Sequence, residues 1–133
     1  MDIGEVLFSM KGRTGRGPFV LLALVGWAMA VGFIPYDPIT VLRQAPVQSI
    51  AALGFALLAA WTAIAVTVKR LHDVGLSGLN SIWIGLAELS GDPLNSHSAL
   101  AMGAAAGSII AQLWLCIEPG SRRPNRFGNP VSA

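Results

Sequence analysis

The chain has 133 residues, of which 53% are hydrophobic and 12% are charged. An average soluble domain is roughly 25% charged, so this chain has too few charged side chains to cover the surface of a soluble globule. The length is enough for one domain. Nine Lys and Arg against seven Asp and Glu give a net charge of +2, and the single cysteine, Cys116, excludes an intramolecular disulfide. We therefore expect one integral membrane domain covering residues 1–133.

The N-terminus carries a short amphipathic pattern. Ile3, Val6, Leu7 and Met10 follow the i, i+3, i+4, i+7 spacing of one helix face. The pattern predicts a short N-terminal interfacial helix that lies on the lipid headgroups. The basic, glycine-rich stretch 11–17 then separates this helix from the first long apolar segment.

Four hydrophobic segments follow in chain order. A membrane-spanning helix needs about 20 predominantly apolar residues to cross roughly 30 Å of hydrocarbon. The third segment is shorter than that, so it either thins the bilayer locally or is re-entrant. The second segment is followed by basic residues and then by Gly75, which is a helix stop signal. The predicted segments are residues 17–36, 47–68, 78–91 and 99–117. The expected fold is therefore an all-α polytopic membrane helical bundle.

The basic residues fall in three clusters that a four-segment topology places on one side of the membrane. The clusters comprise Lys11, Arg13, Arg16, Lys69, Arg70, Arg122, Arg123 and Arg126, and Arg43 alone lies in an alternate loop. The positive-inside rule makes the clustered side cytoplasmic. Merging segments three and four into one crossing would place the three arginines of the tail on the opposite side. The charge distribution therefore favours four segments with both termini in the cytoplasm.

Three motifs stand in order along the chain: FSMKGRTGR, KRLHDVGLSG and PGSRRPNRFGNP. Together they resemble the small bacterial inner-membrane proteins grouped as "domain of unknown function 805". The resemblance covers nearly the whole chain and implies a multi-pass protein of the bacterial inner membrane. It implies no activity.

The same topology brings polar residues of all three motifs to the cytoplasmic face. Guanidinium groups bind phosphate bidentately, and free N–H groups at a helix start attract anions. The sequence therefore predicts a site for an anion, a lipid headgroup or a protein partner. Its candidate residues are Arg13, Arg16, Arg70, His72, Asp73, Ser77, Asn125 and Arg126. The alternative is that the arginines only determine topology, with Asp73 pairing Arg70 at i, i+3 or Lys69 at i, i+4.

The sharper hypothesis is that Arg13, Arg70 and Arg126 approach one another and hold an anion. Asp73 alone cannot balance three guanidinium charges. Either acidic groups such as Glu5 or Glu118 join the cluster, or an outside anion completes it.

Other chemistry has less support in the sequence. His72 and Asp73 lack a nucleophile, and adjacent helix residues point about 100° apart, so we assign no catalytic residue. No ligand spacing predicts a metal site, no cofactor is expected, and the basic clusters lack a nucleic-acid-binding motif. Gly103 and Gly107 form a GxxxG pattern that allows close helix packing, either within the chain or in a homo- or hetero-oligomer.

The leading functional hypothesis is a membrane-embedded binding or accessory protein that engages anionic lipid or a protein partner. The alternatives are a small transporter or channel subunit and, third, an enzyme that modifies lipid headgroups. Polar residues along one face of several segments would favour the transporter, but the first two segments contain almost none.

Overall fold

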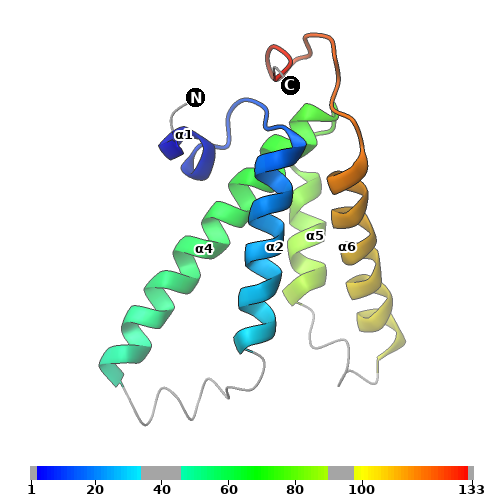
Figure 1. Cartoon of the computed structure of the whole chain (residues 1–133). Helices are drawn as coiled ribbons and strands as arrows, with labels where there is room; N and C mark the ends of the chain where they lie inside the picture. Colours follow the sequence, from blue (N-terminus) through cyan, green and yellow to red (C-terminus); the bar gives the residue numbers. More distant parts are fainter. Residues whose placement is uncertain (1–2, 34–45, 90–97, 132–133) are drawn as a thin grey trace.

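The computed structural model describes residues 3–33, 46–89 and 98–131, and every regular element in these ranges is an α-helix. The helices are α1 (Ile3–Phe8), α2 (Arg16–Phe33), α4 (Pro46–Asp73), α5 (Asn80–Leu89) and α6 (Ala99–Ile117). Helices α2, α4, α5 and α6 extend from one end of the molecule, where α1 and the C-terminal residues also lie (Figure 1). The all-α prediction is confirmed, and each of the four predicted segments contains a helix. Residues 34–36 and 90–91 of those segments, and Arg43, lie outside the described ranges.

Helix α1 forms where the amphipathic pattern predicts it, but it ends at Phe8, so Met10 lies beyond the helix. The helix packs against α4. Its last turn is held there because the Trp61 indole N–H donates a 3.1 Å hydrogen bond to the carbonyl of Phe8.

Helix α4 continues five residues past the predicted end at residue 68 and includes Lys69, Arg70 and His72. It ends at Asp73, two residues before Gly75, whose φ of 86° is unfavourable for residues with a Cβ. The Leu76 N–H bonds to the Leu71 carbonyl at 2.8 Å and the Gly75 N–H to the His72 carbonyl at 3.1 Å. This pair of bonds is a Schellman motif, so the predicted stop signal works as expected.

Helix α5 is only ten residues long and begins at Asn80, two residues later than predicted. The preceding residues form a turn in which the Asn80 N–H bonds to the Ser77 carbonyl at 3.1 Å. Helix α6 has the predicted bounds. It packs against both α5 and α2, and the Trp27 indole N–H of α2 donates to Oε1 of Gln112 in α6 at 2.8 Å.

The packed core lies at one end of the helices. Its buried residues come from α2, α4, α5 and α6, and they are Phe19, Val66, Leu71, Ile84 and Leu115. Away from this core the helices are exposed and apolar, as at Ile50 and Leu53 in α4 and Leu100 in α6. Two helical stretches, Leu53–Asp73 and Ala99–Ile117, are long and apolar enough to cross a membrane.

Candidate functional site

Three segments far apart in sequence converge above the packed core. They are the N-terminal loop (residues 9–15), the last turn of α4, and the segment after α6, residues 119–131, which we call the C-terminal strap. The three are joined by hydrogen bonds from Thr14 to Lys69 and from Ser121 to Asp73. We call this part of the molecule the basic end, and it lies where α1 and the strap are seen in Figure 1.

Asp73 is the centre of the basic end. Its Oδ1 accepts hydrogen bonds from Arg13 Nη2 at 2.8 Å and from Arg13 Nε at 3.0 Å. Its Oδ2 pairs with Arg70 Nη1. The two arginines and the carboxylate are 3%, 0% and 4% exposed, so water screens the ion pairs weakly. We call Arg13, Arg70 and Asp73 the buried triad.

The remaining donors of Arg13 bind backbone carbonyls, mainly of the C-terminal strap. Nη1 donates to the carbonyls of Arg123 at 3.1 Å and Gly128 at 3.3 Å, and Nη2 donates to those of Ser121 and, at 3.3 Å, Asp73. A planar guanidinium with five donors suits this arrangement, whereas a lysine ammonium could not make it. Arg13 therefore ties the N-terminal loop to both α4 and the strap.

Arg70 satisfies the end of α6. Its Nε donates to the Leu115 carbonyl at 2.9 Å, and its Nη2 donates to the Glu118 carbonyl. The Leu115 carbonyl would normally receive the N–H of residue 119, but that residue is a proline and has none. The guanidinium replaces that missing donor and also places a positive charge at the negative end of the α6 dipole.

The buried triad is therefore closed from within. Among the described residues, no buried side-chain nitrogen or oxygen lacks a hydrogen-bond partner. Glu5 and Glu118 do enter the basic end, but through their backbone carbonyls, which accept from Lys69 and Arg70. One carboxylate pairs directly with two guanidinium groups, and carbonyl dipoles together with the more distant charge of Glu118 add to the stabilisation of the positive charge.

Gly120 allows the strap to pass over Asp73. A Cβ built on Gly120 would lie 2.6 Å from Cγ of Asp73 and closer still to Oδ2. No side chain fits there without moving the carboxylate that both arginines bind. Gly120 therefore has a direct part in the site.

His72, Asn125 and Arg126 fasten the rest of the strap. The His72 ring stacks on Phe127, with centroids 3.8 Å apart and an angle of 8° between planes, and its Nδ1 lies 3.1 Å from the Gly12 carbonyl. The Asn125 amide donates to the His72 carbonyl at 2.9 Å. The Arg126 guanidinium carbon lies 4.7 Å from the centre of the Phe127 ring.

The structure thus brings together most of the predicted site residues, in two groups. Arg13, Arg70 and Asp73 form the buried triad, and His72, Asn125 and Arg126 meet at Phe127. Arg126 is exposed, and its described contact is with that ring and not with the triad. Ser77 lies in the turn before α5, where its Oγ accepts the Leu79 N–H at 3.3 Å. Arg16 is the exposed first residue of α2.

Several residues of the site were not predicted from the sequence. Nothing in the sequence marked Phe127 as a site residue except its place in the third motif. In the same way, Thr14 was marked only by its place in the first motif. Lys69 was considered as a partner of Asp73, but its Nζ donates to the Glu5 carbonyl of α1. Backbone carbonyls carry no sequence signature, which is why the partners of Arg13 in the strap could not be foreseen.

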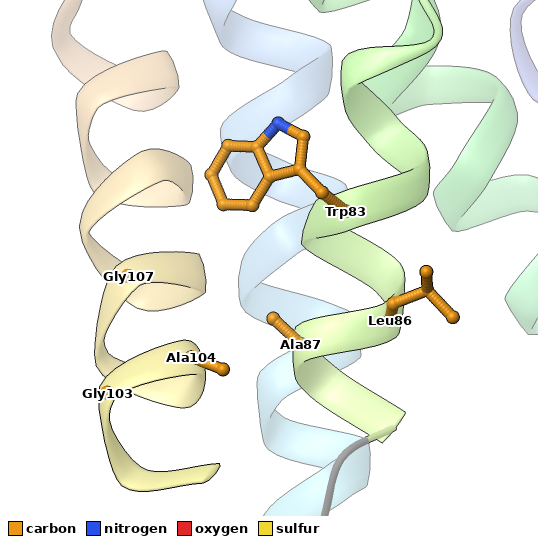
Figure 2. Close-up of a pocket in the computed structure, with 6 residues that line it drawn as sticks. All are labelled: Trp83, Leu86, Ala87, Gly103, Ala104 and Gly107. Atoms are coloured by element: carbon orange, nitrogen blue, oxygen red, sulfur yellow. The ribbon is translucent and has the colours of Figure 1, made fainter. Parts of the chain in front are cut away.

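A second feature lies between α5 and α6, away from the buried triad. Figure 2 shows Trp83 and Ala87 on α5 directed toward Ala104 and the two glycines of α6. The groove has a volume of about 460 Å3 and is lined by Trp83, Leu86, Ala87, Gly103, Ala104 and Gly107. A Cβ added at Gly103 or Gly107 would meet nothing within 4 Å. The GxxxG pattern therefore faces open space beside α5.

Fold and site define a class: a helical protein with two helices fit to cross a membrane and an Arg–Asp–Arg triad closing one end. The chain belongs to the family described as "Protein of unknown function (DUF805)", which matches residues 7–129. This confirms the family indicated by the three sequence motifs. No curated protein and no solved structure matches the chain.

Proposed function

We propose that this chain is a multi-pass membrane protein that binds anionic lipid headgroups at its basic end. The membrane part of the proposal is supported by the exposure of the apolar helices. Only 28% of the apolar window in Leu53–Asp73 and 17% of that in Ala99–Ile117 is buried. The core helix of a soluble protein is mostly buried, whereas lipid covers exposed apolar side chains of this kind.

Four crossings follow if α2 and α5 also enter the bilayer beside α4 and α6. Both pack against α4 and α6, and α5 is short enough to require local thinning or a re-entrant path. In this arrangement the basic end faces the cytoplasm of a bacterium, at the inner membrane. The positive-inside rule supports that orientation.

The observation that carries the headgroup proposal is the division of the basic residues into buried and exposed sets. Arg13, Lys69 and Arg70 are buried and used internally, by Asp73 and by backbone carbonyls. The other basic residues of the basic end remain on its surface, and they are Lys11, Arg16, Arg122, Arg123 and Arg126. Exposed cations beside a bilayer attract anionic headgroups. Arg16, at the start of α2, is well placed to do so because it borders an apolar helix.

The test compares two double variants at exposed residues of the strap, Arg122→Gln/Arg123→Gln and Arg122→Lys/Arg123→Lys. Each basic residue near an anionic surface is worth about 1 kcal/mol, so the Gln pair should weaken headgroup binding roughly 30-fold. The Lys pair keeps the charge and should keep most of the binding. Each protein is placed in nanodiscs of mixed zwitterionic and anionic lipid, and retained phosphatidylglycerol is counted by native mass spectrometry.

The outcomes separate headgroup binding from a purely topological role. Equal retention of anionic lipid by the native, Gln and Lys proteins would reject the proposal. Selective loss in the Gln pair, reversed by lowering the salt concentration, would support it because exposed charges are screened by salt.

A further inference from the structure

We propose that the C-terminal strap is a latch over a latent phosphate-binding site at Arg13. In the closed state, strap carbonyls occupy the positions that phosphate oxygens would take. The inference rests on the proposed function, because it assumes that the basic end meets anionic groups. It adds a specific residue, a specific ligand chemistry and a way of regulating access.

The first support is the set of partners that Arg13 takes from the strap. The carbonyls of Ser121, Arg123 and Gly128 converge on its two terminal nitrogens. Several oxygens around one guanidinium resemble the way a phosphate group is bound bidentately. The Gly128 carbonyl is the most distant of the contacts to Nη1, at 3.3 Å, so it is the least costly to replace.

The second support is an open pocket beside Arg13. It has a volume of about 350 Å3 and lies where the end of the strap meets the N-terminal loop. Its lining includes Gly12, Arg13, Gly128 and Asn129. A ligand in this pocket would approach Arg13 from the side that Gly128 covers. The Asn129 side chain is exposed there and offers an amide donor.

The third support is charge. The buried triad holds two guanidinium groups and one carboxylate, so its formal charge is +1, and the excess is offset by carbonyl dipoles and by the more distant charge of Glu118. A phosphate carries full negative charge and makes stronger, charge-assisted hydrogen bonds than a carbonyl does. Replacing strap carbonyls with phosphate oxygens would therefore improve the electrostatic balance of the triad.

The contacts that fasten the strap at His72 do not involve the Arg13 side chain, although Phe127 also lines the pocket beside it. The strap is fastened by the stack of Phe127 on His72 and by the bond from Asn125 to the His72 carbonyl. Removing the Phe127 ring therefore weakens the latch and opens the pocket further, while the donors of Arg13 stay the same. When only a small fraction of the protein is in the state that can bind a ligand, the apparent affinity is lowered in proportion to that fraction. Loosening the latch should therefore increase the apparent affinity for phosphate.

The experiment measures binding of inorganic phosphate to the full chain in zwitterionic nanodiscs by isothermal titration calorimetry. Phe127→Ala should bind phosphate at least fivefold more tightly than the native protein. Phe8→Ala, which removes an exposed phenylalanine of α1, is the matched control and should not change the affinity. Adding Arg13→Lys to Phe127→Ala should abolish the gain, because lysine cannot offer two parallel donors.

A second arm repeats the comparison in nanodiscs containing phosphatidylglycerol, with retained lipid counted by mass spectrometry. A gain with inorganic phosphate assigns the site to soluble phosphate groups, and a gain only with the anionic lipid assigns it to headgroups. No gain in either arm, or a gain that survives Arg13→Lys, would overturn the proposal.

Hydrogen exchange on the native protein tests the latch without requiring that any variant fold. Saturating phosphate should speed hydrogen exchange at the amide of Ser121, which bonds to the Asp73 carbonyl of α4 in the closed state. Unchanged exchange would contradict a latch. This inference can fail while the proposed function stands, since the Arg122 and Arg123 variants test surface charge and these experiments test the strap.

Discussion

At the scale of single residues, Asp73 is the feature on which the basic end depends. Its carboxylate is the only acidic side chain in the described part of the chain that pairs with the two buried arginines. Removing one partner from a buried, hydrogen-bonded ion pair leaves an uncompensated charge, which costs far more than the pair contributes. We therefore expect the stability of the basic end to be most sensitive to substitution at Asp73.

The first prediction is that Asp73→Asn destabilises the folded chain by about 3–5 kcal/mol, the range for breaking a buried ion pair. The neutral amide keeps the shape of the carboxylate but leaves two guanidinium groups facing no anion. Glu118→Gln is the control, because Glu118 contributes its backbone carbonyl to Arg70. Thermal unfolding in nanodiscs, followed by circular dichroism, checks both. Equal melting temperatures for the two variants would show that the triad is not a structural centre.

The second prediction concerns Gly120. Gly120→Ala places a methyl group against the Asp73 carboxylate, and crowding of this kind costs about 1–3 kcal/mol. Gly17→Ala is the control at the same end, because a Cβ there meets nothing within 4 Å. The same melting experiment should show a lower transition for Gly120→Ala and little change for Gly17→Ala. A native-like transition for Gly120→Ala would mean that the strap does not sit tightly on Asp73.

How far the site could be predicted depends on the kind of contact. The pairing of Arg70 with Asp73 follows from helical spacing, since residues three apart share a face. The approach of Arg13 follows only from the topology, because it comes from 60 residues away. The stack of His72 on Phe127 and the close passage of Gly120 depend on the path of the strap, which turn-rich sequence does not specify.

At the scale of helices, the apolar runs predicted the elements well because a charge-free stretch of this length has few alternatives. The predicted end of α4 and the predicted start of α5 were wrong, because single residues decide where a helix begins or ends. Helix α4 runs on to Asp73 because its last carbonyls find donors in the Schellman turn, Ser121 and Asn125. Helix α5 starts late because Ser77 and the two residues after it form a turn.

The third prediction concerns the contact between α2 and α6. The Trp27 indole N–H of α2 donates a hydrogen bond to Oε1 of Gln112 in α6. Such bonds within membranes contribute about 0.6 kcal/mol on average. A double-mutant cycle with Trp27→Phe and Gln112→Leu, measured by unfolding in bilayers, should give a coupling energy of that size. A coupling energy of zero would mean that the bond contributes nothing to holding α2 against α6.

At the scale of the whole molecule, packing and charge are concentrated at the same end. The core residues Phe19, Leu71 and Leu115 lie directly under the buried triad, while the far parts of α4 and α6 expose apolar side chains. This distribution suits a protein whose helices are held together at one membrane face and surrounded by lipid elsewhere. Under the proposed function, the basic end would be both the anchor of the fold and the surface that meets headgroups.

The central claim is that the basic end lies on one face of the membrane and the start of α6 on the other. It is tested by single cysteines on a Cys116→Ala background, labelled with a membrane-impermeant maleimide in inverted and right-side-out vesicles. The positions are Arg16→Cys, Leu79→Cys, Arg122→Cys and Ser98→Cys, all at exposed residues. We expect the first three to be labelled only from the cytoplasmic face and Ser98→Cys only from the opposite face. Labelling of Ser98→Cys and Arg122→Cys from the same face would contradict the account, because α6 would then not cross the membrane.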